Sequence, residues 1–191
     1  MSPRKKSSNP YEIILLGFFQ ENPLHGYDLF KVISQPGGIS DIWHVNQSNL
    51  YAMLDNLEEN GYLISHLMQI GNTPVRKEYH ITQAGTTRFE KWMVEPVLHG
   101  RDMRQMFLAK LFFAVKDKPE TALRLVTTQK SIANAWKSSI LENMRELTIE
   151  DEYDRLVYTS RLRQIDAWLD WLNECMDSQI INREAAWSSR T

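Results

Sequence analysis

The sequence predicts a mainly α-helical protein of two domains: a winged helix-turn-helix domain, with three helices and a two-stranded β-hairpin wing, followed by an α-helical domain. Three observations lead to this fold class. Apolar residues recur every three or four positions through residues 10–60, and β-rich runs then flank a Gly-Asn-Thr-Pro turn at residues 71–74. Two long amphipathic stripes follow Pro119.

Composition indicates a folded protein without a membrane span. Of the 191 residues, 42% are hydrophobic and 10% aromatic, which is enough to form cores. No apolar run approaches the roughly 20 residues that cross a bilayer, and the basic N-terminus lacks the apolar region of a signal peptide. We therefore expect a cytoplasmic protein with no membrane partner. The lone Cys175 cannot form an internal disulfide and is expected to be a small buried side chain rather than a reactive thiol.

The formal net charge of −2 restricts how the chain could bind nucleic acid. Proteins that bind DNA by bulk attraction are usually basic, so any DNA contact here has to be local. Basic residues gather at Lys5 and Lys6 near the N-terminus and at Arg76 and Lys77 in the predicted hairpin. Such clusters can contact phosphates within a Debye length of about 8–10 Å.

The N-terminal region is expected to form an arm and two core helices. Residues 1–8, rich in Ser and basic side chains, are predicted to be a flexible arm, either a solvated tail or a segment that touches phosphates. Asn9 and Pro10 have the chemistry of a helix start, and this helix is expected to run through Phe19. After an Asn-Pro break, a second short helix is predicted over residues 27–34.

The stretch QSNLYAMLDNLEENGYL, residues 47–63, is the centre of the predicted fold. Its leucines recur at helical spacing and are expected to face the core, which leaves the polar residues at its start on the outside. Asn46 is the predicted N-cap, and the Asn-Gly pair at residues 60–61 is the predicted stop, because both residue types tolerate positive φ. A helix with a dry inner face and a polar first turn can lie against DNA, so we interpret it as a recognition helix.

A hairpin and a connector helix follow this stretch. Residues 62–70 and 75–81 are the predicted strands. Three helices followed by a two-stranded hairpin form the topology of a winged helix, in which the third helix lies in the major groove and the wing touches flanking backbone or the minor groove. Thr82 is the predicted cap of a helix over residues 83–94.

The C-terminal half is predicted to consist of helices that need a partner surface. The strongly apolar segment in a helix over residues 101–115 has to be packed in a core or an interface. The two long helices that follow each carry one apolar stripe, and such helices normally pair with each other or with a symmetry mate. The residues predicted to form a dimer contact are Phe107, Leu111, Trp136, Ile140, Met144, Leu156, Trp168 and Leu172.

Four stretches together resemble the PadR family of bacterial transcriptional regulators, in its longer form with a virulence-activator-type α-helical C-terminal domain. They are LLGFFQENPLHGYDLF, SNLYAMLDNLEENGYL, RKEYHITQAGTTRF and RDMRQMFLAKLFFA, and together they span most of residues 15–114. Each stretch alone is weak, but the combination is specific. Residues 120–191 match the family only in being helical, so their interpretation as a dimerisation domain rests on position and periodicity.

The resemblance implies a homodimer that binds an inverted-repeat operator in double-stranded DNA, usually as a repressor relieved by a small molecule or stress. The DNA contacts that it implies are Gln47, Ser48, Asn49, Tyr51, Arg76 and Lys77. The same residues also have plainer interpretations, as cap-favouring polar residues, a core tyrosine and a solvated strand face. Tyr27, at the start of the second helix, is a further candidate for phosphate contact, with core packing as an equal alternative. The wing has only one basic pair, so we expect its affinity to be modest.

No pattern in the sequence indicates a cofactor, a metal site or an enzyme. The five histidines lack metal-binding spacing, and no phosphate loop, nucleophile elbow or kinase-like set is present. The six tryptophans suit a small hydrophobic or aromatic effector, although core or interface packing is the plainer interpretation. Trp43 and Trp92, near the expected joint between the domains, are the candidate effector pocket, where a ligand would act by favouring one inter-domain arrangement.

The expected domains are a flexible basic arm at residues 1–8, a winged-helix DNA-binding domain with its connector helix at 9–95, an α-helical dimerisation domain at 100–182 and a frayed tail at 183–191. Together they predict a sequence-specific transcriptional regulator, expected to repress. Three alternatives remain: an activator of the same fold, a winged helix used for protein–protein contact, and a small-molecule-binding or enzymatic helical protein. The last two do not explain why a basic hairpin follows a helix with a polar first turn.

Overall fold

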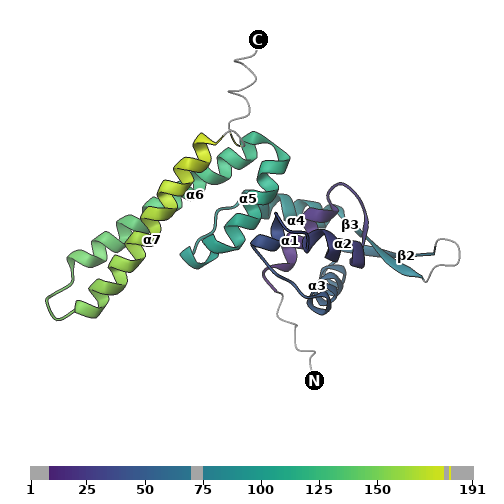
Figure 1. Cartoon of the computed structure of the whole chain (residues 1–191), viewed down its shortest axis with the longest axis horizontal. Coiled ribbons are helices and arrows are strands. Elements are labelled where there is room, and N and C mark those ends of the chain that lie inside the picture. The colour runs from purple at the N-terminus through teal and green to yellow at the C-terminus, as the bar shows by residue number, and fades with distance from the viewer. Residues whose placement is uncertain (1–8, 70–74, 179–180, 182–191) are drawn as a thin grey trace, which may run out of the picture. The chain divides into compact units, whose positions relative to one another are not determined.

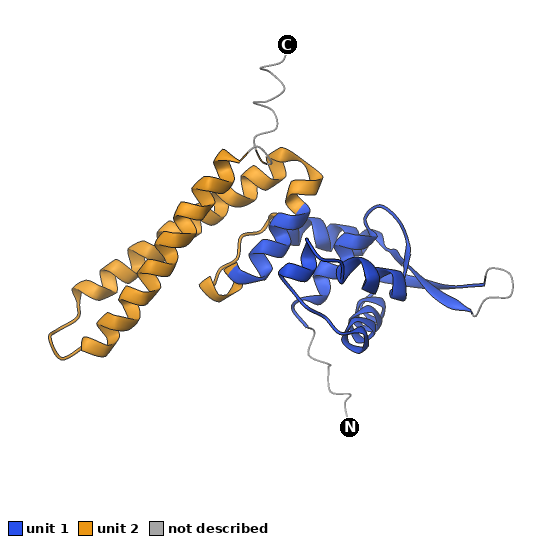
Figure 2. Cartoon of the chain, in the orientation of Figure 1, with its two compact units in different colours: residues 1–93, 104–113 blue, residues 94–103, 114–191 orange. Residues whose placement is uncertain are grey.

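The computed structural model describes residues 9–69, 75–178 and 181, and it divides into two compact units. We call them the winged-helix unit, residues 1–93 and 104–113, and the helical unit, residues 94–103 and 114–191 (Figure 2). This division differs from the expected boundary between residues 95 and 100, because residues 104–113 cluster with the N-terminal part of the chain. The physical reason lies in the aromatic packing described below.

The chain is mainly helical, as predicted, with one small antiparallel sheet (Figure 1). The α-helices are α1 (Glu12–Leu16), α2 (Gly26–Ile33), α3 (Gln47–Glu59), α4 (Gln83–Val94), α5 (Met106–Asp117), α6 (Pro119–Arg145) and α7 (Glu152–Asp177). The 3-10 helices are η1 (Gly17–Phe19), η2 (Ile39–Asp41) and η3 (Gly100–Arg104), and the strands are β1 (Leu24–His25), β2 (Leu63–Met68) and β3 (Arg76–Ile81). The helix expected over residues 101–115 is therefore divided, with η3 preceding α5.

The predicted start of the first helix at Asn9 is wrong, because α1 begins at Glu12 with Tyr11 as its N-cap. Asn9 instead closes the turn that precedes the helix, and the helix is shorter than predicted. The Asn9 side chain accepts a hydrogen bond from the Tyr11 N–H at 3.0 Å, and its carbonyl accepts from the Glu12 N–H at 3.0 Å. From Gly17 the α-helix tightens into η1 instead of continuing through Phe19. At this point the backbone lies against an aromatic ring, since a Cβ at Gly17 would be 2.5 Å from Phe113.

The helix α3 begins and ends by the predicted chemistry. The Asn46 side chain accepts from the Asn49 N–H at 2.8 Å, which confirms the N-cap. Gly61 has a φ of +73°, in the left-handed region, whereas Asn60 keeps a φ of −85°. The predicted stop is confirmed, and of the two residue types that tolerate positive φ only the glycine uses it, because one left-handed residue is enough to reverse the chain.

The sheet has three strands in the order β1-β3-β2, not the two that the sequence predicts. In the wing, β2 and β3 pair from Leu63 opposite Ile81 to Met68 opposite Arg76. The additional strand β1 pairs Leu24 with Tyr79. A strand of two residues has no alternation that could reveal it in the sequence. The predicted turn at residues 71–74 lies outside the described residues.

Thr82 joins the wing to α4, which covers the predicted residues 83–94. Its hydroxyl oxygen accepts from the Gly85 N–H at 3.1 Å, as an N-cap does. The same hydroxyl donates to the Gly61 carbonyl at 2.7 Å. One side chain thus connects the end of α3 to the start of α4.

The core of the winged-helix unit is formed by leucines from three helices and by aromatic rings. Its largest fully buried residues are Ile14, Leu15, Leu16, Leu29, Leu50, Leu54, Leu57, Leu63, Tyr79 and Phe107. Burying one such side chain contributes about 1.5–3 kcal/mol. Phe113 of α5 packs edge-to-face on Phe18 and Phe89, with ring centroids 5.3 and 5.1 Å apart. This packing explains why the first part of α5 belongs to the winged-helix unit.

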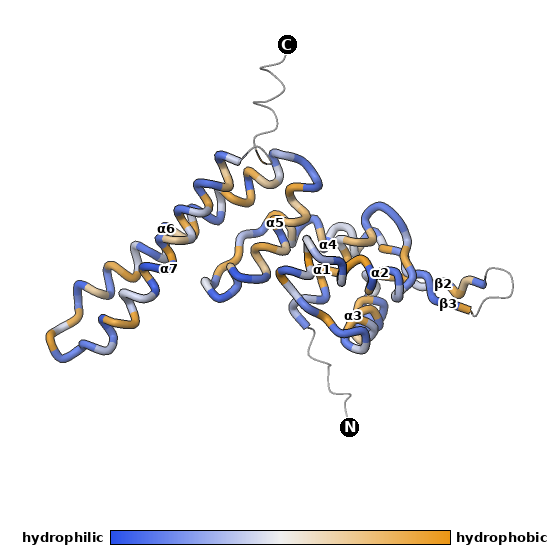
Figure 3. The backbone as a smooth tube through the Cα atoms, in the orientation of Figure 1, coloured by the Kyte–Doolittle hydropathy of each residue, from blue (hydrophilic) through white to orange (hydrophobic). Residues whose placement is uncertain are grey.

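The helical unit is organised by a hairpin of α6 and α7, which lie side by side (Figure 1). Pro119 stands in the first turn of α6, where its missing N–H costs no hydrogen bond. Figure 3 shows hydrophobic residues interleaved with hydrophilic ones along both helices. The residues that are buried in the hairpin are Ala122, Leu125, Val126, Gln129, Ala133, Ile165 and Leu172.

Two observations complete the description of the chain. Within the described ranges, no helix combines the length and the apolar character needed to cross a membrane. Cys175 is half-buried rather than buried, because it lies near the end of the hairpin, and burial raises the pKa of its thiol to about 11. A thiol with a pKa this high carries little thiolate at neutral pH and is a poor nucleophile.

Candidate nucleic-acid interface

The first turn of α3 presents three polar side chains to solvent. Gln47, Ser48 and Asn49 are exposed. None of these side chains has a hydrogen-bond partner among the described residues, because the Asn46 cap uses only the backbone N–H of Asn49. Their amide and hydroxyl groups are the types that bind base edges in the major groove.

The opposite face of α3 holds the helix in place. Leu50, Leu54 and Leu57 are at most 1% exposed. Asn56 lies near the buried Glu12 of α1, whose pKa is raised by burial, an effect that Asn56 partly offsets. The helix can therefore neither rotate nor slide without exposing its leucines, so its first turn stays at the surface.

Two tyrosines and the basic pair of the wing line one hollow. Its volume is about 780 Å³, and Tyr27, Tyr51, Arg76 and Lys77 all contribute to its wall. Tyr27 is 47% exposed, and the Lys31 ammonium lies 4.3 Å from the centroid of its ring. Tyr51 is half-buried against the start of α2. The fold thus brings together four of the residues predicted to contact DNA.

Within the basic pair, Lys77 is engaged by α3. Its ammonium lies 3.2 Å from a carboxylate oxygen of Glu58 and 4.0 Å from one of Asp55. The other Glu58 oxygen accepts from the Ser65 N–H at 3.1 Å and from the Ser65 hydroxyl at 2.5 Å. The Ser65 hydroxyl, and then Lys77, hold the pKa of Glu58 below its usual value. Glu58 therefore ties the end of α3 to both wing strands.

Arg76 differs from its neighbour in pairing, although both side chains are exposed. Its side chain is exposed, and no described residue forms an ion pair with it. Successive residues of a strand point to opposite faces, so only one member of the pair can reach α3. Arg76 is therefore the free cation of the pair, and Lys77 the one that positions the wing.

A histidine cluster at the base of the wing was not predicted. The Glu78 carboxylate lies 2.9 Å from the His80 Nε2 and 4.0 Å from the His25 Nε2. The rings of His66 and His80 meet edge-to-face with centroids 4.9 Å apart. The register of the sheet, with His25 and His66 both opposite Glu78, would have revealed the cluster. No group of His, Cys, Asp or Glu side chains in the described part of the chain is arranged to hold a metal ion.

The two tryptophans of the candidate effector pocket have separate partners. Trp43 is 7% exposed and stacks on Tyr11, with ring centroids 5.9 Å apart. Trp92 is also 7% exposed, and its backbone carbonyl accepts from the buried Lys110 ammonium, which lies 4.5 Å from the indole centroid. The effector role of these indoles stays a prediction.

The residues predicted for dimerisation occupy very different environments. Phe107 and Leu172 are fully buried within one chain. Trp136 and Trp168 pack on each other edge-to-face with centroids 6.2 Å apart. Leu156 is 65% exposed. The remaining three, Leu111, Ile140 and Met144, are half-buried. Lys5 and Lys6, in the predicted arm, lie outside the described residues.

Comparison with known families identifies both parts of the chain. Residues 15–91 match the transcriptional regulator PadR-like family, and residues 103–178 match the virulence activator alpha C-terminal family. The chain belongs to the PadR-like family of transcriptional regulators. This confirms the resemblance found in the sequence, and the family is one of regulators rather than of enzymes.

The proteins similar to this chain include PadR from Bacillus subtilis. The negative transcriptional regulator PadR of strain 168 is 22% identical over 99 residues, which are 52% of this chain and about half, 53%, of that relative. The crystal structure of B. subtilis PadR in complex with operator DNA has a TM-score of 0.46 at 19% identity, covering 88% of this chain and 98% of that one. Its complex with p-coumaric acid has a TM-score of 0.40 at 20% identity, covering 87% and 96%. Because the sequence identities are at most 22% and both TM-scores are below 0.5, the roles of individual residues in this PadR-family chain are inferred from its own geometry.

Proposed function

We propose that this PadR-family regulator binds a specific sequence in double-stranded DNA as a homodimer on an inverted-repeat operator. The observation that carries the proposal is the first turn of α3. Three polar side chains that have no hydrogen-bond partner in the described part of the chain stand there, on a helix whose other face is held by fully buried leucines. A rigid helix with free hydrogen-bonding groups is what base readout in the major groove requires.

Some residues of the interface read the DNA sequence, and others position the protein on the DNA backbone. Gln47, Ser48 and Asn49 contact base edges, and Arg76 contacts the phosphate backbone from the wing. Lys77 acts through Glu58, by holding the wing at a defined angle to α3. Tyr27 and Tyr51 line the hollow beside Arg76, and their hydroxyls bind a phosphate of the flanking backbone.

Two copies of the chain are needed because a single copy has little positive charge with which to bind DNA. The net charge is −2, so bulk attraction adds nothing to affinity. Exposed apolar side chains near the turn of the α6–α7 hairpin support a self-association surface. They are Leu141, Ile149, Tyr153 and Leu156, which are 42%, 95%, 77% and 65% exposed. Two recognition helices held at one spacing then read two half-sites.

Repression relieved by an effector completes the proposal. The B. subtilis relative is named a negative regulator, and it has been crystallised with p-coumaric acid. By analogy, this chain blocks transcription when bound to its operator, and a small hydrophobic or aromatic compound releases it.

A gel-shift titration on DNA from the chain's own promoter region, at two salt concentrations, tests the DNA-binding function. Asn49→Ala should change which sequences are preferred, with about 1–3 kcal/mol lost at the base pair it contacts. Arg76→Gln should weaken binding to all sequences alike and reduce the salt slope by about 1. Arg88→Gln, on the exposed side of α4, is the matched control. Absence of preference over random DNA at both salt concentrations would refute the proposal.

The apolar surface of the wing favours a second candidate function, contact with another protein. Ile64, Leu67, Met68 and Val75 are 47%, 72%, 42% and 54% exposed. Exposed apolar side chains on a two-stranded ribbon are common at protein interfaces. This candidate predicts that Leu67→Ser removes a protein partner and leaves the gel shift unchanged.

A further inference from the structure

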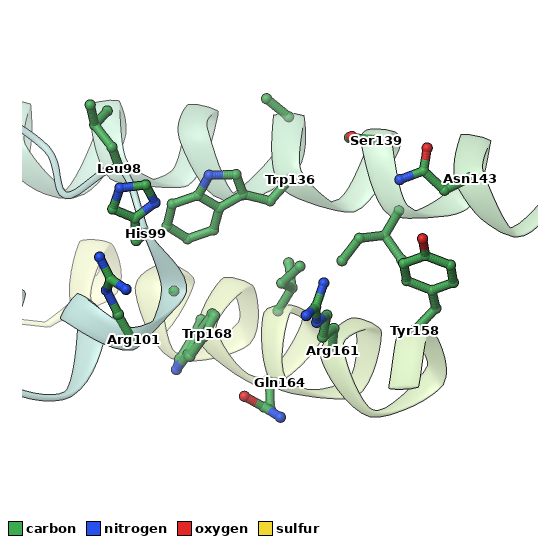
Figure 4. Close-up of a pocket in the computed structure, with 14 residues that line it drawn as sticks. Leu98, His99, Arg101, Trp136, Ser139, Asn143, Tyr158, Arg161, Gln164 and Trp168 are labelled. Carbon is green, nitrogen blue, oxygen red and sulfur yellow. The ribbon is translucent and has the colours of Figure 1, made fainter. Parts of the chain in front are cut away.

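Two groups of side chains have no part in the DNA contacts proposed above. One lines a hollow of about 740 Å³ between α6 and α7, where Trp136 and Trp168 meet (Figure 4). The same hairpin carries the apolar surface proposed for self-association, so a second copy of the chain accounts for this hollow. The other group is the histidine cluster around Glu78 at the base of the wing.

The histidine cluster lies on the same face of the sheet as Arg76. Residues two positions apart in a strand point to one face, so Arg76, Glu78 and His80 of β3 share it. Residues opposite each other in an antiparallel pair also share a face, which adds His66 of β2 and His25 of β1, both opposite Glu78. These ionisable side chains from three strands therefore form one surface.

This surface has no net charge while its imidazoles are neutral. Among the described strand residues Glu78 is the only acid, and its charge offsets that of Arg76. Imidazole is the side chain that ordinarily changes charge between about pH 5 and pH 8, so each proton taken up adds one positive charge. At a rise of about 3.3 Å per residue, the level of Glu78 is about 7 Å from Arg76, which is within a Debye length of about 8–10 Å.

His25 has a ring nitrogen that faces the carboxylate and can take up a proton. Its Nδ1 lies 3.0 Å from the Lys77 carbonyl oxygen. Because a carbonyl oxygen only accepts, Nδ1 carries the hydrogen of the neutral ring and Nε2 keeps a lone pair. This Nε2 lies 4.0 Å from a Glu78 oxygen. A proton on Nε2 therefore replaces a contact between a lone pair and a carboxylate by an ion pair.

The rings of His80 and His66 complete the cluster. An ionised carboxylate only accepts, so the His80 Nε2, 2.9 Å from the second Glu78 oxygen, carries the hydrogen of that bond. Its Nδ1 is then the nitrogen that can take up a further proton. His66 is exposed and meets His80 edge-to-face, with centroids 4.9 Å apart. Two positive rings at this distance repel each other, so we expect the pair to share one proton before it holds two.

His25 also connects the cluster to the hollow of about 780 Å³ at the wing. It lines this hollow together with Tyr27, Tyr51 and Arg76, the residues proposed to contact DNA phosphates. Lys77 lines it too, but its ammonium is paired with a carboxylate of α3. A protonated His25 therefore adds a second cation beside Arg76 at the place where the proposed function puts a phosphate.

The helices packed against these strands carry no further imidazole. The helix α2 packs on β1 and β3, and α3 packs on β2. Their titratable residues are Tyr27, Asp28, Lys31, Tyr51, Asp55, Glu58 and Glu59. Carboxylates, phenols and ammonium groups ordinarily keep one charge state between about pH 6 and pH 8. The dipole of α2 disfavours a positive ring at its N-cap, His25, and Asp28 in its first turn offsets this effect.

We propose that proton uptake by the histidine cluster strengthens the contact of the wing with the DNA backbone, so that this regulator binds its operator more tightly in mildly acidic conditions. His25 is then a further phosphate-binding residue, and Glu78 keeps the surface neutral at higher pH. The inference rests on the proposed function and adds a regulating ligand, the proton. By linkage, the DNA complex also binds these protons more tightly than the free protein does.

Fluorescence anisotropy of the full chain tests this inference. The probes are a labelled duplex from its own promoter region and a scrambled duplex of the same length, at about pH 8 and about pH 6. We expect the affinity for both duplexes to rise about tenfold at the lower pH, and the salt slope to steepen by about 1 per chain. Calorimetry in two buffers of different ionisation enthalpy should show an uptake of about one proton per chain on binding.

The triple variant His25→Asn, His66→Gln, His80→Gln replaces the rings by neutral amides. The amide at position 25 can still donate to the Lys77 carbonyl, and the amide at position 80 can still donate to Glu78. Circular dichroism should therefore show that the variant folds. We expect it to bind with equal affinity at the two pH values and to take up no proton.

Two single variants serve as controls. His99→Asn changes an exposed histidine of the helical unit and should keep the full pH dependence. His44 is exposed just before α3 and is the rival source of a pH effect, so His44→Asn should keep it as well. Glu78→Gln should bind both duplexes more tightly than the parent chain at about pH 8, because the charge of Arg76 is then no longer offset.

The inference is overturned if the triple variant keeps the pH dependence, if His44→Asn removes it, or if Glu78→Gln weakens binding. Its failure and the failure of the proposed function are distinguishable. Preference for the promoter duplex without any effect of pH would overturn this inference alone. An effect of pH that depends on the cluster, without preference between the duplexes, would support the inference and overturn sequence-specific binding.

Discussion

The recognition helix α3 and the distal half of the α6–α7 hairpin have similar apolar periodicity but opposite burial. In α3, Leu50 and Leu54 are fully buried. In the hairpin, no residue from 134 to 164 is buried, and Ile149 and Tyr153 are 95% and 77% exposed. The same kind of pattern thus forms a complete core in one region and an unfinished surface in the other.

The difference shows what a single copy of the chain can complete. A winged helix surrounds its third helix with two other helices and a sheet, so each leucine of the inner stripe finds neighbours. A two-helix hairpin buries only the stripe between its helices, and apolar residues on its other faces need a further surface. We therefore expect substitutions in α3 to change folding stability and substitutions in the distal hairpin to change association.

The largest expected effect is that of Leu54→Ala in α3. Removing a fully buried leucine side chain leaves a cavity and should lower the free energy of unfolding by about 2–5 kcal/mol, measured by urea denaturation. Leu67→Ala, on the exposed wing, is the control and should change it by less than about 0.5 kcal/mol. Equal losses for the two variants would contradict the burial argument.

A smaller effect, on association, is expected from Leu156→Glu in the hairpin. Its side chain is 65% exposed in one chain, so the variant should fold, but a carboxylate in an apolar contact should raise the dimer dissociation constant at least about tenfold. Sedimentation equilibrium over a range of concentrations measures this. Asp154→Asn is the control on the same helix. A dimer of unchanged affinity would show that the surface lies elsewhere.

The smallest effect is expected from Glu58→Gln, which removes the ion pair between Glu58 of α3 and Lys77 of the wing. Folding lowers the pKa of Glu58, so its ionised carboxylate stabilises the folded state at pH values above the ordinary pKa of 4.5. This stabilisation is lost as the pH falls through the lowered pKa. The variant should lose about 0.5–1 kcal/mol at pH 7, since the pair with Lys77 is partly exposed, and this difference should shrink below pH 4.5. Glu59→Gln is the control, because Glu59 is exposed and forms no ion pair among the described residues. A difference that does not change with pH would exclude the ionic contribution.

Local chemistry accounts for most of what could be predicted from the sequence. The caps at Asn46 and Thr82, the stop at Gly61 and the bounds of α4 all follow from side chains within a few positions of one another. The third strand and the histidine cluster at Glu78 could not be predicted, because they depend on residues about fifty positions apart in the chain. The same reason explains the shift of residues 104–113 into the winged-helix unit.

The sequence by itself determined the winged helix and the polar first turn of α3, because periodicity, capping and turn chemistry are local properties. The family followed from the resemblance of its motifs. Only the tertiary structure distinguished the role of Arg76 from that of Lys77, because the acidic partner of Lys77 on α3 cannot be inferred from two adjacent basic residues. It likewise turned Trp136 and Trp168 from members of an apolar stripe into the wall of a cavity. An apolar stripe in the sequence indicates that side chains share one face of a helix, but the packing of other elements determines which residues contact that face.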